Sequence, residues 1–130
     1  MDISVQSVVV EVVPRDLQRS LDFYRLLGLN VPSSDESHVE VQLPGGNKLA
    51  FDTEEVIGGM HPGWTPPEGP GRVAIAFGFG APGDVDTVFE RLTAAGHPAT
   101  LEPFDAPWGQ RYATVEDPDG TSVDLFAALA

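Results

Sequence analysis

Apolar and polar residues alternate along several short segments of the chain, as they do in strands that bury one face. His38 to Leu43 alternates strictly, and Arg72 to Phe79 separates branched and aromatic residues from a second face of mostly small ones. A face of small residues is typical of a sheet that lines a hollow. Composition and turn residues predict further strands at residues 3–13, 48–52, 97–102, 110–116 and 121–127.

Two other segments repeat apolar residues at the spacing of an α-helix. In the first, Asp16 is suited to cap the helix and Gly28 to end it in the left-handed conformation. In the second, Asp84 is expected to cap the helix and Gly96 to end it. The sequence therefore predicts helices over residues 16–28 and 84–96.

The two helices and their flanking strands form an internal repeat with a constant offset of 68 residues. Each half is predicted to have the order βαβββ, which indicates an α+β fold of two tandem modules that bury their sheets together. We expect modules at residues 1–57 and 72–130, joined by a Gly/Pro-rich loop at 58–71, within one structural domain. The hairpin around Ala50 matches the hairpin around Asp124 in this repeat.

The last predicted hairpin contains Asp124, a carboxylate in an otherwise largely apolar strand. Asp117-Pro118-Asp119-Gly120 is a turn sequence, since Pro118 fixes its own φ and Gly120 tolerates a positive φ. In the strand that follows, Val123 and Leu125 alternate with Asp124 and Phe126. One face of this strand therefore presents a carboxylate and a ring, either to solvent or to a cavity.

These motifs resemble the vicinal oxygen chelate superfamily, which holds glyoxalase I, extradiol dioxygenases, fosfomycin resistance enzymes and bleomycin-resistance binding proteins. The resemblance rests on the closing hairpin, Glu116 to Phe126, and on the first helix with its exit, Asp16 to Leu29. It implies two βαβββ modules forming a cupped mixed sheet around a cavity, with helices on the outer face. It also implies a homodimer, because sites in this family are often completed between subunits.

Metal-dependent relatives hold a divalent ion with four His or Glu side chains, and the resemblance places the last of these at Asp124. The repeat partner of Asp124 is Ala50 or Leu49, and neither can ligate a metal. A useful site needs about three protein ligands. Glu11 and His38 could assist Asp124 only if the strand register allowed it. We therefore expect no metal and no other cofactor, as in the bleomycin-resistance branch.

The candidate ligand-binding residues are mostly aromatic or charged. Trp108, Arg111 and Tyr112 form the most site-like cluster, since they combine two rings with a guanidinium that can clamp a carboxylate or stack on a ring. Phe126 and the loop residue Trp64 add rings, and Asp124 and Glu11 add carboxylates. Trp64 could equally cap the core, and Arg111 could equally pair with one of the many acids.

The net charge and the composition exclude several classes of binding partner. The net charge of −13 should repel nucleic acids and anionic membranes, so we expect neither as a partner. A cationic small molecule is easier to accommodate. The chain has no cysteine, which excludes disulfides and thiol chemistry, and it shows no leader-like or membrane-spanning run. We expect a cytoplasmic protein.

A dinucleotide-binding motif, Gly78 to Gly83, offers a competing hypothesis because it follows a predicted strand and precedes a helix. Its chemistry is unsuitable: Pro82 lacks the N–H that would face a phosphate, and Asp84 places a negative charge where a pyrophosphate would lie.

The pattern as a whole favours a small-molecule binding protein that sequesters an antibiotic or another aromatic or cationic natural product without metal, and so provides antibiotic resistance. Two enzymatic alternatives stay open. One is a metal-dependent lyase, isomerase or dioxygenase of the glyoxalase type. The other is a metal-free enzyme that uses Glu11 or Asp124 as a base.

Overall fold

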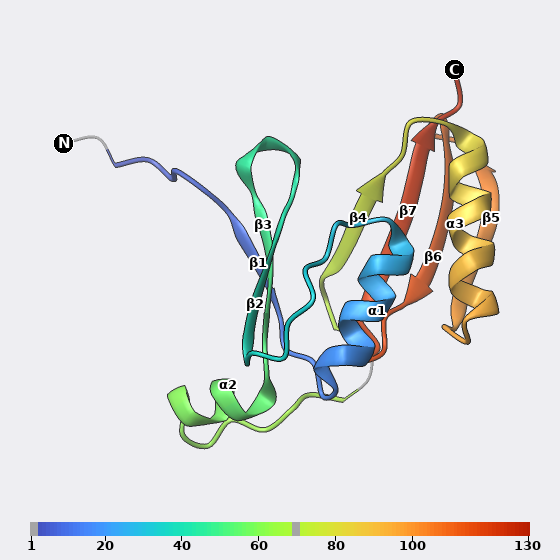
Figure 1. Cartoon of the computed structure of the whole chain (residues 1–130). Coiled ribbons are helices and arrows are strands. Elements are labelled where there is room, and N and C mark those ends of the chain that lie inside the picture. The colour runs from blue at the N-terminus through green and yellow to red at the C-terminus, as the bar shows by residue number, and fades with distance from the viewer. Residues whose placement is uncertain (1–2, 69–70) are drawn as a thin grey trace.

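The computed structural model describes residues 3–68 and 71–130, and within them the strands form two mixed sheets. The N-terminal sheet has the strand order β1-β3-β2, and the C-terminal sheet has the order β4-β7-β6-β5. In each sheet one strand pair is parallel and the others are antiparallel. Figure 1 shows the two sheets side by side, with α1 and α3 in front of them. The α+β class with mixed sheets is thereby confirmed.

The N-terminal half consists of β1 (Val9–Val12), α1 (Leu17–Leu27), β2 (His38–Gln42), a 3-10 turn (Pro44–Gly46), β3 (Lys48–Asp52) and α2 (Glu54–Met60). The predicted caps of the first helix are confirmed. The Asp16 carboxylate accepts a hydrogen bond from the N–H of Arg19, and Gly28 has a φ of 118°. The chain before β1 extends away from both sheets in Figure 1, and Ile3 is 88% exposed.

The C-terminal half consists of β4 (Ala74–Gly78), α3 (Pro82–Ala94), β5 (Ala99–Ala106), β6 (Gln110–Glu116) and β7 (Ser122–Ala128). The helix begins earlier than predicted, because Pro82 takes the first helical position, where a missing N–H is not needed. Asp84 therefore lies in the first turn and is not the cap, which is Ala81. A carboxylate in the first turn still interacts favourably with the helix dipole.

Four other expectations were wrong in detail. The first strand is only Val9–Val12, and the described N-terminal half has one strand fewer than the predicted βαβββ order. The expected loop at 58–71 begins inside α2, whose N-cap Thr53 accepts a hydrogen bond from the N–H of Val56. The fifth strand continues to Ala106, because Phe104 and Ala106 pair with β6.

The internal repeat is visible in the strand register. Across the N-terminal sheet, Ala50 of β3 lies between Glu11 of β1 and Glu40 of β2. Across the C-terminal sheet, Asp124 of β7 lies between Ala76 of β4 and Thr114 of β6. Ala50 and Asp124 therefore occupy equivalent central positions, as predicted from the two hairpins.

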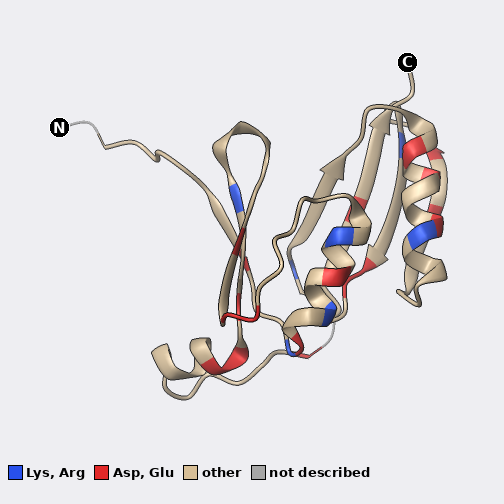
Figure 2. Cartoon of the chain, in the orientation of Figure 1, with Lys and Arg blue, Asp and Glu red and all other residues tan. Residues whose placement is uncertain are grey.

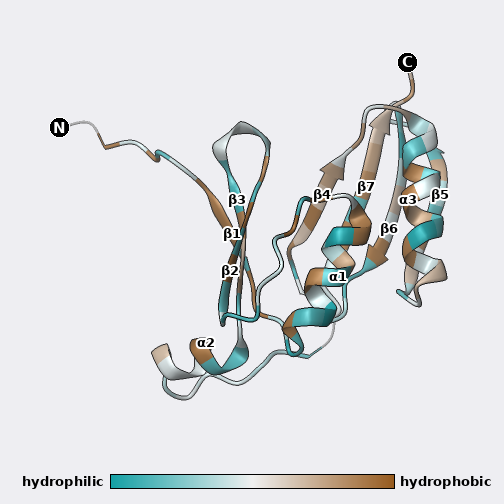
Figure 3. Ribbon diagram, in the orientation of Figure 1, coloured by the Kyte–Doolittle hydropathy of each residue, from teal (hydrophilic) through white to brown (hydrophobic). Residues whose placement is uncertain are grey.

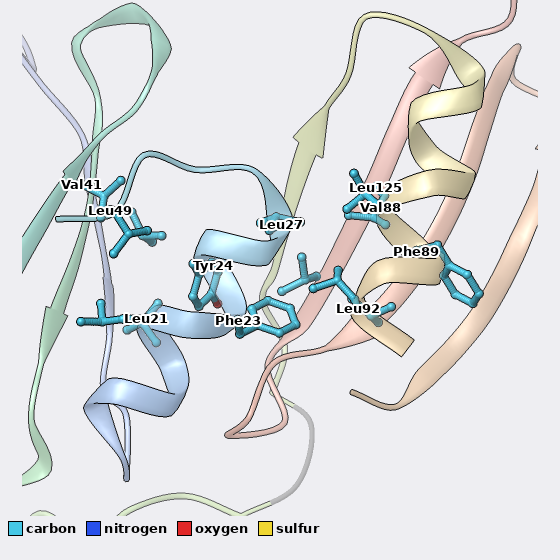
Figure 4. Packing of buried hydrophobic residues seen from close by; sticks show 14 of the residues in the cluster. Leu21, Phe23, Tyr24, Leu27, Val41, Leu49, Val88, Phe89, Leu92 and Leu125 are labelled. Atoms are coloured by element: carbon cyan, nitrogen blue, oxygen red, sulfur yellow. The ribbon is translucent and has the colours of Figure 1, made fainter. Parts of the chain in front are cut away.

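The core lies between the helices and the sheets. Brown, apolar segments of α1, α3 and the strands lie toward one another in Figure 3. Figure 4 shows Leu21 of α1 beside Val41 and Leu49 of the N-terminal sheet, while Phe23 points the other way, toward Leu92 of α3. Because α1 presents apolar side chains in both directions, a single helix packs the two halves together.

Tyr24 of α1 is the residue that joins the halves most directly. Its fully buried ring packs edge-on against Phe51 of β3, with centroids 5.2 Å apart, and lies 6.4 Å from the ring of Phe77 in β4. Its hydroxyl donates a hydrogen bond of 2.8 Å to the buried carboxylate of Asp117. Burial and the nearby Asp117 charge raise the pKa of Tyr24 well above its ordinary value.

Asp117 in turn shapes the β6–β7 turn. Its Oδ1 accepts hydrogen bonds from the backbone N–H groups of Asp119 and Thr121, both at 2.9 Å. Gly120 takes a φ of 86° and its N–H bonds to the Asp117 carbonyl, which confirms the predicted turn. One buried carboxylate thus orders the turn and binds it to α1.

In the part of the chain that the structure describes, no helix is long and apolar enough to cross a membrane.

We predict that Tyr24→Phe lowers the free energy of unfolding by about 1.5–3 kcal/mol, because it leaves the buried Asp117 carboxylate without one of its donors. Urea unfolding followed by circular dichroism measures this loss. Tyr112→Phe is the matched control, since its hydroxyl also bonds to an aspartate but at a partly exposed position, and its loss should be smaller. Equal stability of Tyr24→Phe and the parent protein would contradict the assigned role.

Candidate functional site

The C-terminal sheet has one face covered by α3 and one open face. Ala113 and Val115 of β6 and Val123 and Leu125 of β7 are fully buried on the covered face. The alternate residues of the same strands are only partly buried and point the other way. We call this second face the open face, and its side chains include Tyr112, Thr114, Asp124 and Phe126.

Asp124 is the polar centre of the open face. The Tyr112 hydroxyl donates to its Oδ2 over 2.5 Å, and the Thr114 hydroxyl donates to its Oδ1 over 2.9 Å. The bond to Asp124 raises the pKa of Tyr112 to about 12, so the phenol stays protonated at neutral pH. Two hydroxyl donors therefore hold the carboxylate in a fixed orientation.

Aromatic rings border this carboxylate. The ring of Trp108 lies 5.4 Å from that of Tyr112 and 6.1 Å from that of Phe104, both nearly perpendicular. The Trp108 Nε1 donates to the Gln110 side chain over 2.8 Å, which fixes the indole although it is 58% exposed. An ordered but exposed indole offers a large contact area to a ligand at little further cost in conformational entropy.

Small residues leave room beside the rings. Ala74, Ala76 and Gly78 of β4 share the open face with Asp124 and Phe126, as the register of β4 and β7 requires. A Cβ atom added at Gly78 would lie 2.8 Å from the ring of Phe126, closer than such contacts occur. Gly78 is thus required for the ring to lie over the edge strand.

Arg111 does not join this group. It alternates with Tyr112 along β6, and its guanidinium pairs with Asp86 of α3 at 3.1 and 3.2 Å and with Asp105 of β5 at 3.1 Å. These partners raise its pKa further above its ordinary value, with the bond to Asp86 as the largest cause. Arg111 therefore fastens α3 to the sheet, and we leave it out of the proposed site.

Glu11 and Trp64 also lie apart from Asp124. Both line a cavity of about 530 Å³ beside the adjacent edge strands β1 and β4 of the two sheets, which we call the seam pocket. The residues that line it do not include Trp108, Tyr112, Asp124 or Phe126. The structure thus divides the predicted site residues among the open face, the helix-covered face and the seam pocket.

The N-terminal sheet holds a charged cluster that the sequence did not reveal. His38 Nδ1 lies 2.5 Å from the buried Asp52 carboxylate, His38 Nε2 lies 3.0 Å from Glu40, and Lys48 donates to Glu40 over 3.1 Å. The bonds to Asp52 and then Glu40 raise the pKa of His38. The alternation in the sequence places His38 and Glu40 on one face of β2, but the pairing of His38 with Asp52 depends on the β2–β3 register.

The residues at the family's metal positions do not fit a divalent ion. Both Asp124 oxygens accept hydroxyl hydrogen bonds, and its neighbours in register, Ala76 and Thr114, supply no carboxylate or imidazole. The equivalent position in the other sheet is Ala50, which is buried. Among residues 3–68 and 71–130, no three His, Cys, Asp or Glu side chains gather as a metal site would require. Figure 2 shows the acidic residues spread over both halves.

Comparison with protein families identifies one model, described as the glyoxalase/bleomycin resistance protein/dioxygenase superfamily, which matches residues 6–125. No curated protein matches the chain.

Solved structures with the same fold cover nearly the whole chain. A glyoxalase/bleomycin resistance protein/dioxygenase from Nocardioides is 28% identical, with a TM-score of 0.74 over 99% of this chain and 87% of that one. A glyoxalase-related enzyme from Fulvimarina pelagi is 26% identical, with a TM-score of 0.80 over 94% of this chain and 87% of that one. TnmS3, an antibiotic binding protein from Streptomyces sp. CB03234, is 24% identical, with a TM-score of 0.66 over 98% of both chains.

We predict that Asp124→Asn lowers the pKa of Tyr112 from about 12 toward that of free tyrosine, because the anionic acceptor is lost. Tyrosinate absorbance should then appear near pH 10 in the variant and only at higher pH in the parent protein. The chain has two tyrosines, and Tyr24→Phe in both backgrounds isolates the signal of Tyr112. Identical titrations would show that the two side chains do not bond.

We predict that His38 stabilises the fold in a pH-dependent way. Its folded pKa is raised, so its contribution is complete below the unfolded value of about 6.5 and is lost as pH rises through the folded pKa. The difference in unfolding free energy between the parent protein and His38→Gln should therefore be largest at mildly acidic pH and shrink in alkaline buffer.

The exposed His61 provides the control for this experiment, since it has no carboxylate partner among the described residues. The effect of His61→Gln should vary less with pH. A His38→Gln effect that is constant across the range would contradict the cluster's role.

Proposed function

Because the chain belongs to the glyoxalase/bleomycin resistance protein/dioxygenase superfamily, we propose that it binds a small organic molecule on the open face of its C-terminal sheet, without a metal. The ligand we propose is an aromatic, cationic natural product such as an antibiotic. Sequestration of such a molecule would protect a cell from it.

The observation that carries this proposal is the oriented Asp124 carboxylate within an aromatic border. Tyr112 donates to one of its oxygens and Thr114 to the other, so its position is fixed. A ligand cation placed over Trp108 or Tyr112 would meet the negative faces of the rings and the charge of Asp124 together. Planar rings of the ligand could stack on the exposed indole.

The overall charge supports the same class of ligand. At −13, the protein attracts cations and repels anions over its whole surface. Ala74 and Ala76 are small residues of the same face, and Ala76 lies opposite Asp124 in register, so neither side chain fills the space beside the carboxylate. TnmS3, which shares the fold, is an antibiotic binding protein, and this is consistent with the proposed ligand class.

We further propose that a second copy of the chain covers the open face. Two large apolar residues of β5 and of the turn after it are exposed in the monomer, Leu101 at 40% and Trp108 at 58%. A homodimer would bury such residues and enclose the ligand. We also propose a cytoplasmic location, which the cysteine-free composition supports.

The enzymatic alternatives find less support in the site. A glyoxalase-type lyase or dioxygenase requires a metal, and the donor set around Asp124 lacks the other ligands. A base needs partners that accept or relay the proton it removes, and the neighbours of Asp124 in register, Ala76 and Thr114, supply no titratable side chain. Glu11 lies on the other sheet and lines the seam pocket, so it does not pair with Asp124.

Thermal shift with a panel of aromatic, cationic natural products tests the proposal, followed by calorimetry on each compound that stabilises the protein. We predict that Trp108→Ala weakens binding by about 1–3 kcal/mol through the lost ring contact. Asp124→Asn should weaken cationic ligands more than neutral analogues of the same shape.

Trp64→Ala is the matched control, because it removes the chain's other indole from the seam pocket. It should leave the affinity unchanged. Binding that survives Trp108→Ala and is lost in Trp64→Ala would place the ligand elsewhere and refute the proposed site.

A further inference from the structure

The seam pocket has the size and composition of a second ligand site, separate from the open face. It lies between β1 and β4 and is bordered by the β6–β7 turn and by Trp64 of the segment after α2. Its volume of about 530 Å³ is within the range of pockets that bind small organic molecules. None of the residues proposed above for the open face lines it.

Two arginines without acidic partners line this pocket. Of the seven Lys and Arg residues, Arg25, Lys48 and Arg111 pair with a carboxylate. Arg19 and Arg91 form no ion pair among the described residues and do not line the pocket. Arg15 and Arg72 have no ion pair in the part of the chain that the structure describes, and both line the seam pocket. Their guanidinium groups are available to bind a carboxylate.

An acceptor for a positive group lies directly beside Arg15. Asp119 Oδ1 accepts the backbone N–H of Arg15 over 3.0 Å, whereas its Oδ2 is buried and has no hydrogen-bond partner. Burial raises the pKa of the Asp119 carboxyl. A buried oxygen without a donor is unfavourable, and an N–H group that enters from the pocket would relieve this.

The other walls suit an apolar body. Trp64 and Pro66 come from the segment after α2, and Val73 and Ile75 from β4 and the residues before it. Glu11, Glu54 and Glu68 add three further carboxylates to the lining. Acids therefore outnumber the two arginines, which disfavours a purely anionic ligand and favours one that also carries a positive charge.

We propose that the seam pocket binds a free α-amino acid with an apolar or aromatic side chain. Its carboxylate pairs with Arg15 and Arg72, its ammonium group donates to Asp119, and its side chain packs against Trp64 and the apolar wall. The backbone N–H of Arg15 bonds to Asp119, so the Arg15 side chain begins beside this carboxylate, as the two charged groups of an α-amino acid lie beside one another. This inference does not depend on the proposed function of the open face.

Tryptophan fluorescence of the Trp108→Phe variant tests the proposal, because Trp64 is then the one remaining indole. The probes are L-phenylalanine, 3-phenylpropionate, which lacks the ammonium group, and phenethylamine, which lacks the carboxylate. We expect saturable binding of L-phenylalanine at millimolar concentrations, reported by Trp64. Each truncated probe should bind at least about tenfold more weakly, because one charge-assisted contact is lost.

Variants locate the site. Arg15→Gln and Arg72→Gln should each weaken L-phenylalanine about tenfold or more. Arg19→Gln removes the same charge from an exposed arginine of α1 that does not line the pocket, and it should have no effect. All these arginines are exposed, so circular dichroism should show folded variants.

Three results would overturn the proposal. The first is no saturable binding of L-phenylalanine or L-leucine to the parent protein by calorimetry. The second is binding that Arg15→Gln and Arg72→Gln leave unchanged. The third is equal binding of L-phenylalanine and phenethylamine. Binding at the open face is tested with different compounds and with the Trp108→Ala variant. One of the two proposed sites can therefore be refuted while the other is confirmed.

Discussion

The buried hydrogen bond between Tyr24 and Asp117 is the interaction on which the arrangement of the two halves depends. The ring of Tyr24 packs on Phe51 of the N-terminal sheet, while its hydroxyl binds the carboxylate that organises the β6–β7 turn of the C-terminal sheet. A buried carboxylate needs all its donors, so this contact tolerates little displacement. It sets α1, the turn and both sheets in one relative position.

The candidate site follows from that constraint. The Asp117 turn fixes the register of β6 against β7, which places Thr114 opposite Asp124 and Tyr112 opposite Phe126. A shift of one residue would turn Asp124 toward α3 and bury a charge in the apolar core. The same seam between the halves also forms the second pocket, where Asp119 of the turn lies beside Arg15. One short turn therefore contributes to two separate surfaces.

Much of the fold was predictable from local patterns. Alternation identified the strands, Asp16 and Gly28 bounded α1, and the repeat placed Ala50 and Asp124 at equivalent positions. The errors lie where local preference is weak. Residues 3–8 precede the first strand, which begins only at Val9, and the Glu54–Met60 helix depends on the Thr53 cap ahead of two glycines.

The site was predictable only in part, because side-chain partners depend on register. Alternation placed Asp124 and Phe126 on one face, but it could not show that Tyr112 and Thr114 donate to Asp124. It also could not show that Arg111 forms an ion pair with Asp86, or that Trp64 and Glu11 line the seam pocket. The His38 to Asp52 contact joins residues of two strands and had no sequence pattern of its own.

The central claim is that Asp124 acts as an oriented carboxylate in a ligand site and not as a metal ligand. Metal content measured by mass spectrometry tests this directly, on protein purified without chelator, incubated with Mn, Fe, Co, Ni or Zn, and then desalted. The account predicts that no metal is retained in stoichiometric amount and that Asp124→Ala changes nothing. Near-stoichiometric retention that Asp124→Ala abolishes would contradict the account and point to a metal-dependent lyase or dioxygenase.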